Sequence, residues 1–397
     1  MAERLSDLLP RLVSDEQGAF QKGKIILSNI GLASELANLL HTSVRGGGIG
    51  IKIDVQKAYD TLSWDFLFVV LKKFGFSDVW LAWIHEILVS SRISVLLNGG
   101  PVGFFGVEKE EVLCRGLNGL LKEGKLKALP GPRGAIVPSH LLFVDDIFIF
   151  MNVRAKHVRC MREFLIKYQE FSGQKISLEK SKVFFGKVVP HSKRYVSDLL
   201  GIPICSLPMR YLGVEIFKGT VKKDRMLPLM DKIKSRLQGW QGKLLSMASR
   251  AELIRSVILG MPIHNFSIYW WPESVIKTVE RWIRNFLWSG DISTVKKITV
   301  KWEEICRPKE EGGLGIRRLR DVNCTVLSKL VWQMKHEGST FSSFLRARFV
   351  NEGGDLKKGY RASSVFKGIV KMWNFVSLSE RWMVGTGEDI CFGRIDG

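Results

Sequence analysis

The chain has 397 residues, of which 46% are hydrophobic and 25% charged, and this balance indicates a globular protein of two or three domains. Charges interrupt its apolar stretches before they reach the length of a membrane helix, and the N-terminus lacks the apolar core of a secretory signal. We therefore expect an intracellular protein of the nucleus or cytoplasm, with no membrane segment. Its six cysteines show no Cys-x-x-Cys spacing, so neither a disulfide framework nor a zinc ribbon can be inferred from them.

The net charge of +21 comes entirely from the later part of the chain. Residues 1–150 contain 16 basic and 16 acidic side chains, whereas the residues that follow contain 44 and 23. A neutral first part followed by a basic second part is typical of a protein whose later region binds a polyanionic duplex. The alternative is a basic surface that is merely solvated, and the segregation of the charge disfavours it.

Helices and strands alternate in the first part of the chain. Apolar spacing predicts a helix over 25–44, which the glycine run 46–48 ends. That run could cradle a phosphate, but a strand follows it rather than a Lys-Ser or Lys-Thr pair, so a turn is the better interpretation. The strand over 49–54 leads to a helix that begins near Ser63 and carries a core-facing apolar stripe. The stripe consists of Trp64, Leu67, Leu71 and Phe74. A helix over 79–88 and a strand over 93–97 follow, and this alternation predicts an α/β fold.

Three carboxylates stand in apolar surroundings. Asp54 ends the strand that contains Ile51 and Ile53, while Asp145 and Asp146 interrupt the apolar run 140–150, which predicts a further strand or hairpin. Burying an ionised carboxylate is costly unless it is paired or binds a metal. Three carboxylates from two strands could hold two Mg²⁺ ions about 3.5–4 Å apart, and Mn²⁺ could replace them. The alternatives are a hairpin turn with solvated aspartates, and a helix cap at Asp54.

The rest of the chain is predicted to be mostly helical. A strand over 183–185 follows the polar segment 173–182, and Tyr211-Leu212-Gly213-Val214 is compatible with an ordinary β-hairpin. Basic residues alternate with apolar ones in 222–260 and 274–288. By default, such apolar stripes are core faces and such charges are solvated faces.

Two motifs together resemble a known family. Ile53–Asp60 and Phe143–Asp146 resemble the A and C motifs of reverse transcriptases. The wider match, which includes Leu8–Phe20, Tyr211–Val214 and Gly312–Ile316, is to plant non-LTR (LINE-type) retrotransposon polyproteins. The resemblance implies an RNA-directed DNA polymerase that extends a DNA primer on an RNA template with deoxynucleoside triphosphates. It also implies an α/β right-hand palm, with a mixed sheet and helices, partial fingers and a basic helical thumb.

The resemblance assigns a role to each carboxylate. It implies that Asp54 and Asp145 are the metal ligands proper, that Asp146 supports them, and that the backbone carbonyl oxygen of Val55 is a further ligand. Consecutive strand residues point to opposite faces, which is why Asp146 is given the supporting role. In the implied mechanism, one metal activates the primer 3′-hydroxyl and the other holds the triphosphate.

Two further residues match nucleotide-binding positions of the family. Tyr59 matches the bulky residue that excludes a ribose 2′-hydroxyl, although a core aromatic residue at the start of a helix is the alternative. Lys180 matches a lysine near the incoming nucleotide, in a segment where this chain has Ser177 instead of the usual asparagine. The hairpin at Tyr211 resembles the family's support for the primer end.

By the same resemblance, the chain divides into a reverse transcriptase domain over 1–217 and two helical regions. The parts are partial fingers 1–48, a palm 49–217 with an internal deletion near 107–115, a thumb 218–290, and a C-terminal region 291–397 that precedes a missing zinc-binding module.

The chain departs from the family pattern between its A and C motifs. No Gln-Gly-Asp-Pro-type B motif occurs, and residues 101–112 run directly into 113–117. This join indicates a deletion that removes a wall of the nucleotide pocket, and the early fingers are also missing. We therefore expect a catalytically impaired polymerase. The alternative class is a non-catalytic nucleic-acid-binding remnant of a retroelement.

Overall fold

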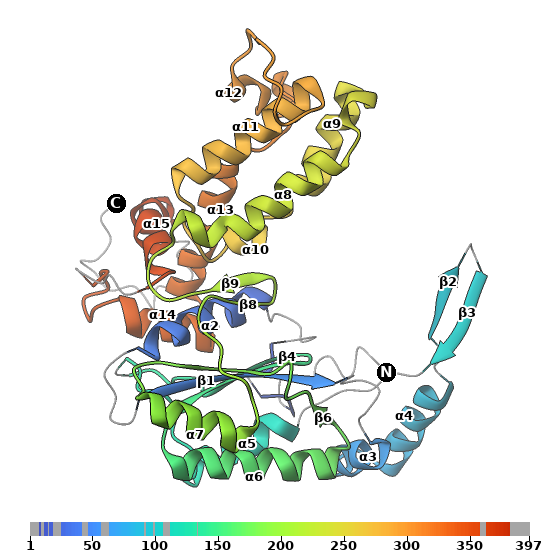
Figure 1. Ribbon diagram of the computed structural model, residues 1–397, viewed down its shortest axis with the longest axis vertical. Helices are drawn as coiled ribbons and strands as arrows, with labels where there is room; N and C mark the ends of the chain where they lie inside the picture. The colour runs from blue at the N-terminus through green and yellow to red at the C-terminus, as the bar shows by residue number, and fades with distance from the viewer. Residues whose placement is uncertain are drawn as a thin grey trace.

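The computed structural model describes most of the chain (Figure 1). The described residues are 8, 12–14, 16–18, 25–41, 47–56, 63–90, 93–97, 100–105, 112–132, 134–357 and 363–381. Residues 42–46, which include the first glycine of the run 46–48, therefore lie outside the described residues, as do residues 106–111 at the predicted deletion. Among the helices that are described, none is long and apolar enough to cross a membrane.

A five-stranded sheet forms the centre of the first half, and β1 is its hub. β4 and β5 form a hairpin, β5 pairs with β1, and β6 and β7 both pair with the other edge of β1. The five strands are β1 (Gly48–Gln56), β4 (His140–Phe143), β5 (Asp146–Asn152), β6 (Lys175–Ile176) and β7 (Lys182–Phe185). The expected α/β arrangement, with helices around a central sheet, is confirmed.

The expectation of a mixed sheet needs correction. Every pair among the named strands is antiparallel, and parallel pairing in the described residues is limited to the isolated bridges Gln17–Leu142 and Val183–Ile204. The reason is the position of β1. The helix α6 (Ala155–Ser172) connects β5 to β6 and β7, which run in the same direction as β5, but antiparallel β1 lies between them. The parallel strands are therefore never neighbours.

The two faces of the sheet belong to different cores. On one face, Ile51, Ile53 and Ile149 pack with helices α5, α6 and α7. On the other face, Phe148, Phe150 and other large side chains share a core with α2, the β8–β9 hairpin and the C-terminal helices. The elements named here for the first time are α2 (Ile26–Leu39), α5 (Val112–Lys122), α7 (Pro190–Leu200), β8 (Met209–Tyr211) and β9 (Val214–Ile216). Strand alternation makes this division possible, because successive side chains point to opposite faces.

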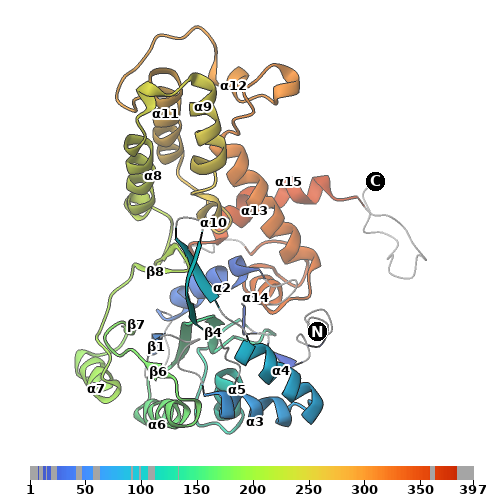
Figure 2. The same ribbon diagram turned by 90° about the vertical axis from the view of Figure 1, so that its right-hand side faces the viewer.

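The helices after β9 extend away from the sheet and then return to it (Figures 1 and 2). α8, α9 and α11 rise from the hairpin, α13 leads back to α14, which packs against α2, and α15 packs on α13. Their bounds are α8 (Leu227–Gly239), α9 (Met247–Leu253), α10 (Ile263–Phe266), α11 (Glu273–Ser289), α12 (Trp302–Ile305), α13 (Leu319–His336), α14 (Thr340–Phe349) and α15 (Phe366–Ser379). The expected core face of α11 comprised Val275, Val279, Trp282, Ile283 and Phe286; four of these are buried as predicted, and Trp282 is partly buried.

The helix pair α3 (Trp64–Lys73) and α4 (Asp78–Ser90) departs from expectation. The helix start is correct, because the Ser63 hydroxyl accepts a hydrogen bond from the N–H of Phe66 at 3.4 Å. The burial is only partial, however: the four stripe residues of α3 are half-buried, neither helix contains a fully buried residue, and Trp83 and Ile87 of α4 are 51% and 47% exposed. The pair protrudes beside the sheet and leads into a separate ribbon, β2 (Ile93–Leu97) and β3 (Gly100–Phe105) (Figures 1 and 2). Periodicity identified an apolar side of the helix but not what covers it.

A buried ion pair joins α2 to the C-terminal helices. Glu35 of α2 and Arg348 of α14 approach to 2.7 Å, and both side chains are almost fully buried. The Ser363 hydroxyl donates a second bond to Glu35 at 2.6 Å. Burial raises the pKa of the Glu35 carboxyl, while the charge of Arg348 opposes that shift.

We predict that Glu35→Gln destabilises the protein by about 3–5 kcal/mol, because it leaves the guanidinium of Arg348 buried without its counter-charge. The loss is measured as a change in the free energy of unfolding in denaturant. The matched control is Glu304→Gln, which removes an exposed pair with Arg307 and should cost less than about 1 kcal/mol.

The double variant Glu35→Leu/Arg348→Met separates charge from packing. Replacing both charges by apolar groups of similar size should cost less than the single change does. A Glu35→Gln variant as stable as the Glu304→Gln control would contradict the proposed importance of the buried pair.

Candidate active site and nucleic-acid interface

The three predicted carboxylates lie at one end of the sheet. Asp54 on β1 is directly opposite Asp146 on β5, and cross-strand partners of this kind point to the same face. Asp145 is exposed in the turn of the β4–β5 hairpin, and its carbonyl oxygen accepts a hydrogen bond from the N–H of Val55 at 3.4 Å. The structure therefore brings the backbones of Asp54, Val55, Asp145 and Asp146 together.

The turn that carries Asp145 has an unusual backbone. Val144 adopts a φ of 56°, in the left-handed region that favours glycine. A β-branched side chain is costly there, and such strain gathers at functional sites where the surrounding structure holds it in place. Here the flanking pair Phe143–Asp146 closes the hairpin and holds the turn. The strained turn thus delivers Asp145 next to the end of β1.

Asp146 has a partner that the sequence analysis missed. The Nζ of Lys52 lies 2.7 Å from Oδ1 of Asp146, and both side chains are about four-fifths buried. Lys52 precedes Asp54 by two residues on the same strand, so strand alternation alone puts both on one face. The spacing Lys-x-Asp within an apolar strand was the signal that could have predicted this ion pair.

A turn before β7 holds the backbone of Asp54. The N–H of Ser177 donates to the carbonyl oxygen of Asp54 at 2.9 Å, and the Asp54 N–H donates to the Ser181 hydroxyl at 3.1 Å. The Ser181 hydroxyl in turn donates to the carbonyl oxygen of Ser177 at 2.6 Å. Lys180 is exposed within this turn, so the structure brings it to the carboxylate end of the sheet. Ser181 is a positioning residue that the sequence analysis did not identify.

The donor set suits a hard cation. Carboxylate oxygens are the ligands that Mg²⁺ and Mn²⁺ prefer, and the ion pair at Asp146 indicates that this end of the sheet requires positive charge. Within the described part of the chain, no three His, Cys, Asp or Glu side chains approach closely enough to hold a metal ion. The convergence of the three carboxylates on a metal stays a prediction. Tyr59, the expected sugar-selecting residue, lies outside the described residues.

The β8–β9 hairpin supports the strand that carries Asp146. Tyr211 is fully buried, and its ring meets Phe148 edge to face with centroids 4.6 Å apart. Phe148 lies two residues beyond Asp146 on the same face of β5. Burial, with a smaller contribution from the charge of Asp146, raises the pKa of the Tyr211 phenol well above its ordinary value. The predicted hairpin is present, and its role at a primer end stays a prediction.

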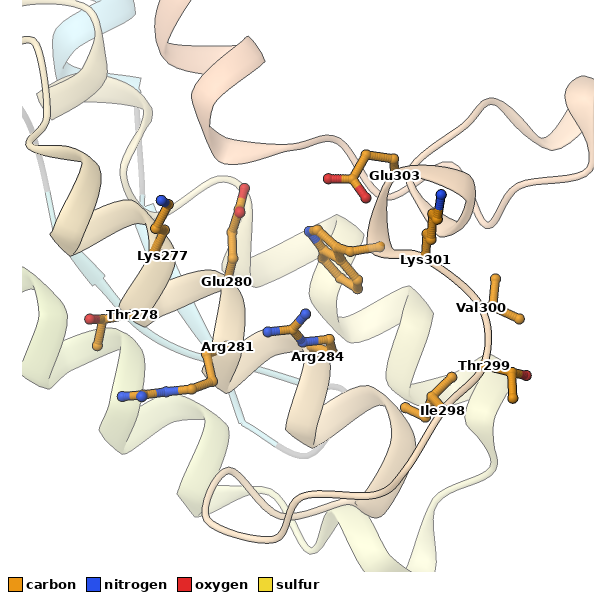
Figure 3. A pocket seen from close by; sticks show the side chains of 11 residues that line it. Lys277, Thr278, Glu280, Arg281, Arg284, Ile298, Thr299, Val300, Lys301 and Glu303 are labelled. Atoms are coloured by element: carbon orange, nitrogen blue, oxygen red, sulfur yellow. The ribbon is translucent and has the colours of Figure 1, made fainter.

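The basic half of the chain presents a cationic groove beside α11 (Figure 3). Lys277, Arg281 and Arg284 are exposed on the face of α11 opposite its buried residues. Together with the segment 298–303 they line a groove of about 670 Å³. Two carboxylates, Glu280 and Glu303, also line it.

The groove keeps a net positive charge, because its lining contains four cationic side chains, the three of α11 and Lys301, and two carboxylates. The carboxylate of Glu280 accepts a hydrogen bond from the N–H of Leu319 at 2.9 Å and so caps α13. Burial raises the pKa of this carboxyl. Among the ion pairs between described residues, none involves the three cations of α11. Figure 3 shows these side chains projecting from α11, with the extended segment 298–301 across from them. This arrangement can accept a row of phosphates.

Relatives in two kingdoms share parts of this sequence. The chain is 31% identical over 183 residues to an Arabidopsis thaliana protein described as a ribonuclease H protein, covering 45% of this chain and 30% of the relative. It is 23% identical over 318 residues to the retrovirus-related Pol polyprotein from the type-2 retrotransposable element R2DM of Drosophila melanogaster, covering 74% and 29%. The chain thus spans less than a third of the length of these two relatives.

The chain is also similar to a solved structure and to a protein family. A Candida albicans telomerase aligns with a TM-score of 0.37 and 12% identity, over 88% of this chain and 57% of that one. Residues 1–216, which include Asp54, Asp145 and Asp146, match the family Reverse transcriptase (RNA-dependent DNA polymerase). Since the match covers more than half of its length, the chain belongs to the reverse transcriptase family.

Proposed function

We propose that this chain is the polymerase part of a non-LTR retrotransposon reverse transcriptase. It would extend a DNA primer on an RNA template by transfer from deoxynucleoside triphosphates. The observation that carries the proposal is the register of β1 and β5, which pairs Asp54 with Asp146 and holds Asp145 beside them within a sequence of this family. The primer–template duplex would lie between this end of the sheet and the basic helices.

The residues around the carboxylates suit this role. When bound, two divalent ions would lower the pKa of the primer 3′-hydroxyl and stabilise the leaving pyrophosphate. Asp54 and Asp145 would hold these ions, with Asp146 and the carbonyl oxygen of Val55 in support. The Ser177–Ser181 turn holds the backbone of Asp54 in position, and Lys52 orients and neutralises Asp146. Lys180 and Tyr59 would face the incoming nucleotide, with Tyr59 selecting against a 2′-hydroxyl.

We further propose that catalysis is impaired in this chain. Phosphoryl transfer depends largely on positioning the nucleotide against the primer, and the B segment that supports this geometry is missing. The exposed apolar side chains of Trp83 and Ile87 on α4 support the idea that a covering segment is absent. They also favour the competing function, in which the chain only binds nucleic acid.

Metal binding should depend on the carboxylates whether or not the chain turns over. We predict that Asp54→Asn and Asp145→Asn each weaken Mn²⁺ binding, measured by electron paramagnetic resonance, by more than about 100-fold. The reason is that changes to residues behind the ligands already cost about 10–100-fold. The control is Asp231→Asn on an exposed position of α8, which should have no effect. Equal Mn²⁺ affinity in all three variants would rule out the proposed metal site.

Catalysis should be recovered by restoring the missing segment. We predict that the chain incorporates deoxynucleotides on an RNA template at close to background rate, and that a family-type B segment inserted after Val107 raises the rate by more than about 10²-fold. Misplacement of reacting groups by about 1 Å already costs on the order of 10²-fold. Asp145→Asn should abolish the recovered activity. Robust synthesis by the unrepaired chain, lost in Asp145→Asn, would disprove the impairment but not the function.

Duplex binding should depend on the cations of α11. Each phosphate contact that is lost lowers the slope of log K against log[salt] by about 0.9. We therefore predict that Lys277→Gln/Arg281→Gln/Arg284→Gln weakens binding of a primer–template duplex and lowers this slope by about 2–3, as measured by fluorescence anisotropy at several salt concentrations.

A control with the same change in charge tests whether position matters. Lys156→Gln/Arg162→Gln/Lys167→Gln removes three exposed cations from α6, which lies on the opposite side of the sheet from α11 (Figure 1). It should leave the slope nearly unchanged. Equal losses in the two triple variants would mean that net charge, and not the groove at α11, determines binding.

A further inference from the structure

A second cationic pocket lies at the other end of the central sheet. It has a volume of about 650 Å³ and lies between α7, the end of β7 and the segment that leads from β9 toward α8. Phe185, which helps to line it, pairs with Ile49 near the start of β1, whereas Asp54 is five residues further along that strand. At about 3.3 Å per residue, the pocket is roughly 17 Å along the strand from the carboxylates. We call it the β7 pocket.

Basic side chains from three parts of the chain meet in the β7 pocket. His41 comes from the end of α2, Lys193 from α7, and Lys218 and Arg225 from the segment after β9. None of the described residues that line the pocket is Asp or Glu. The one ion pair formed by these cations among the described residues joins Arg225 to the exposed Asp224 at 3.7 Å, a distance at which exposed pairs contribute little.

The positive charge in the pocket is close enough to affect its own members. Partial burial, followed by the charges of Lys218, Lys187 and Lys193, lowers the pKa of His41. His41 and Lys193 are half-buried, so water only partly screens this repulsion. Gathering cations in a partly desolvated cavity without a counter-charge is unfavourable, and an anion would relieve it.

The pocket also has an apolar wall. Phe185, half-buried at the end of β7, and the partly exposed Ile204 and Leu207 also line it. A small inorganic anion would leave this wall unused. A nucleotide would use both parts, because its phosphate is anionic and every base has a flat apolar face that stacks on such surfaces.

We propose that the β7 pocket is a second nucleotide site, separate from the carboxylate end, in which Lys193, Lys218 and Arg225 bind a phosphate and Phe185 contacts the attached base. The phosphate comes either from a single-stranded nucleic acid or from a free nucleotide. Binding of either one does not require the polymerase chemistry proposed above, so this proposal can be tested independently of the proposed function.

The first test uses the unaltered chain and follows His41. The imidazole resonance is assigned by comparison with His41→Gln, and its pKa is measured by NMR with and without 5′-AMP or a single-stranded octanucleotide. A phosphate beside the ring favours the charged form, so we expect the pKa of His41 to rise by about 1 or more. If neither probe changes the pKa of His41, the proposal is wrong.

The second test measures affinity with matched variants. Lys193→Gln/Lys218→Gln should weaken binding of the effective probe by at least about tenfold, since hydrogen bonds to charged groups are lost. The control Lys156→Gln/Lys167→Gln removes the same charge from α6 and should change binding less than twofold. Binding of the octanucleotide but not 5′-AMP identifies a nucleic-acid strand as the source, and the reverse identifies a free nucleotide.

The cations of α11 could also bind the octanucleotide, so their contribution has to be measured separately. The pocket variant is therefore also measured in a chain that carries Lys277→Gln/Arg281→Gln/Arg284→Gln. Because the two sets of residues lie on separate elements, their effects on octanucleotide binding should multiply. A pocket variant that binds both probes as tightly as its α6 control, in either background, would overturn the β7 pocket without affecting the proposal for α11.

Discussion

The arrangement of this molecule depends on the burial of one helix, α2. Eleven of its residues are buried, and the four polar ones, which include Asn29 with its hydrogen bond to the carbonyl oxygen of Leu142, are bonded to distant parts of the chain. Ser34 hydrogen bonds to Tyr269 and Ser364, Glu35 pairs with Arg348, and Asn38 accepts the N–H of Gly219. Buried polar groups are costly unless satisfied, so each bond fixes the helix against a specific partner. Through α2, the sheet and the C-terminal helices form one body, and the basic helices acquire a defined position relative to the carboxylates.

The strand β1 determines on which face of the sheet the functional side chains lie. Its alternation sends Ile51 and Ile53 into one core and Lys52 and Asp54 to the opposite face. The same strand pairs with β5 on one edge and with β6 and β7 on the other, so the strands that lead to the segments around Asp54 are all hydrogen-bonded to it. Ser181 and the turn at Val144 are therefore consequences of strand pairing: each follows or precedes a strand that β1 has already aligned. The carboxylate end is preorganised by backbone hydrogen bonds more than by side-chain packing.

Local patterns predicted the elements well and their surroundings poorly. The strand before Asp54, the hairpin around Asp145 and the amphipathic α11 each follow from periodicity and turn chemistry within about ten residues. The Lys52–Asp146 pair, the β7 pocket and the burial of Glu35 depend on partners about 90 to 310 residues away in sequence, which periodicity does not encode. The apolar stripe of α3 shows the same limit: its spacing predicted a core face, but α4 and Arg115 cover it only in part and none of its residues is fully buried.

The two cores explain how binding and catalysis could separate in this chain. The carboxylate face, the β8–β9 hairpin and the basic helices rest on the core that contains α2, whereas α5, which follows the predicted deletion, packs on the opposite side of the sheet. Loss of a segment before α5 therefore removes neither the partners of α2 nor the cations of α11. Electrostatic binding to phosphates tolerates small displacements, because it varies smoothly with distance, but in-line transfer does not. A chain altered at this point can thus lose turnover while it keeps its fold and its affinity for nucleic acid.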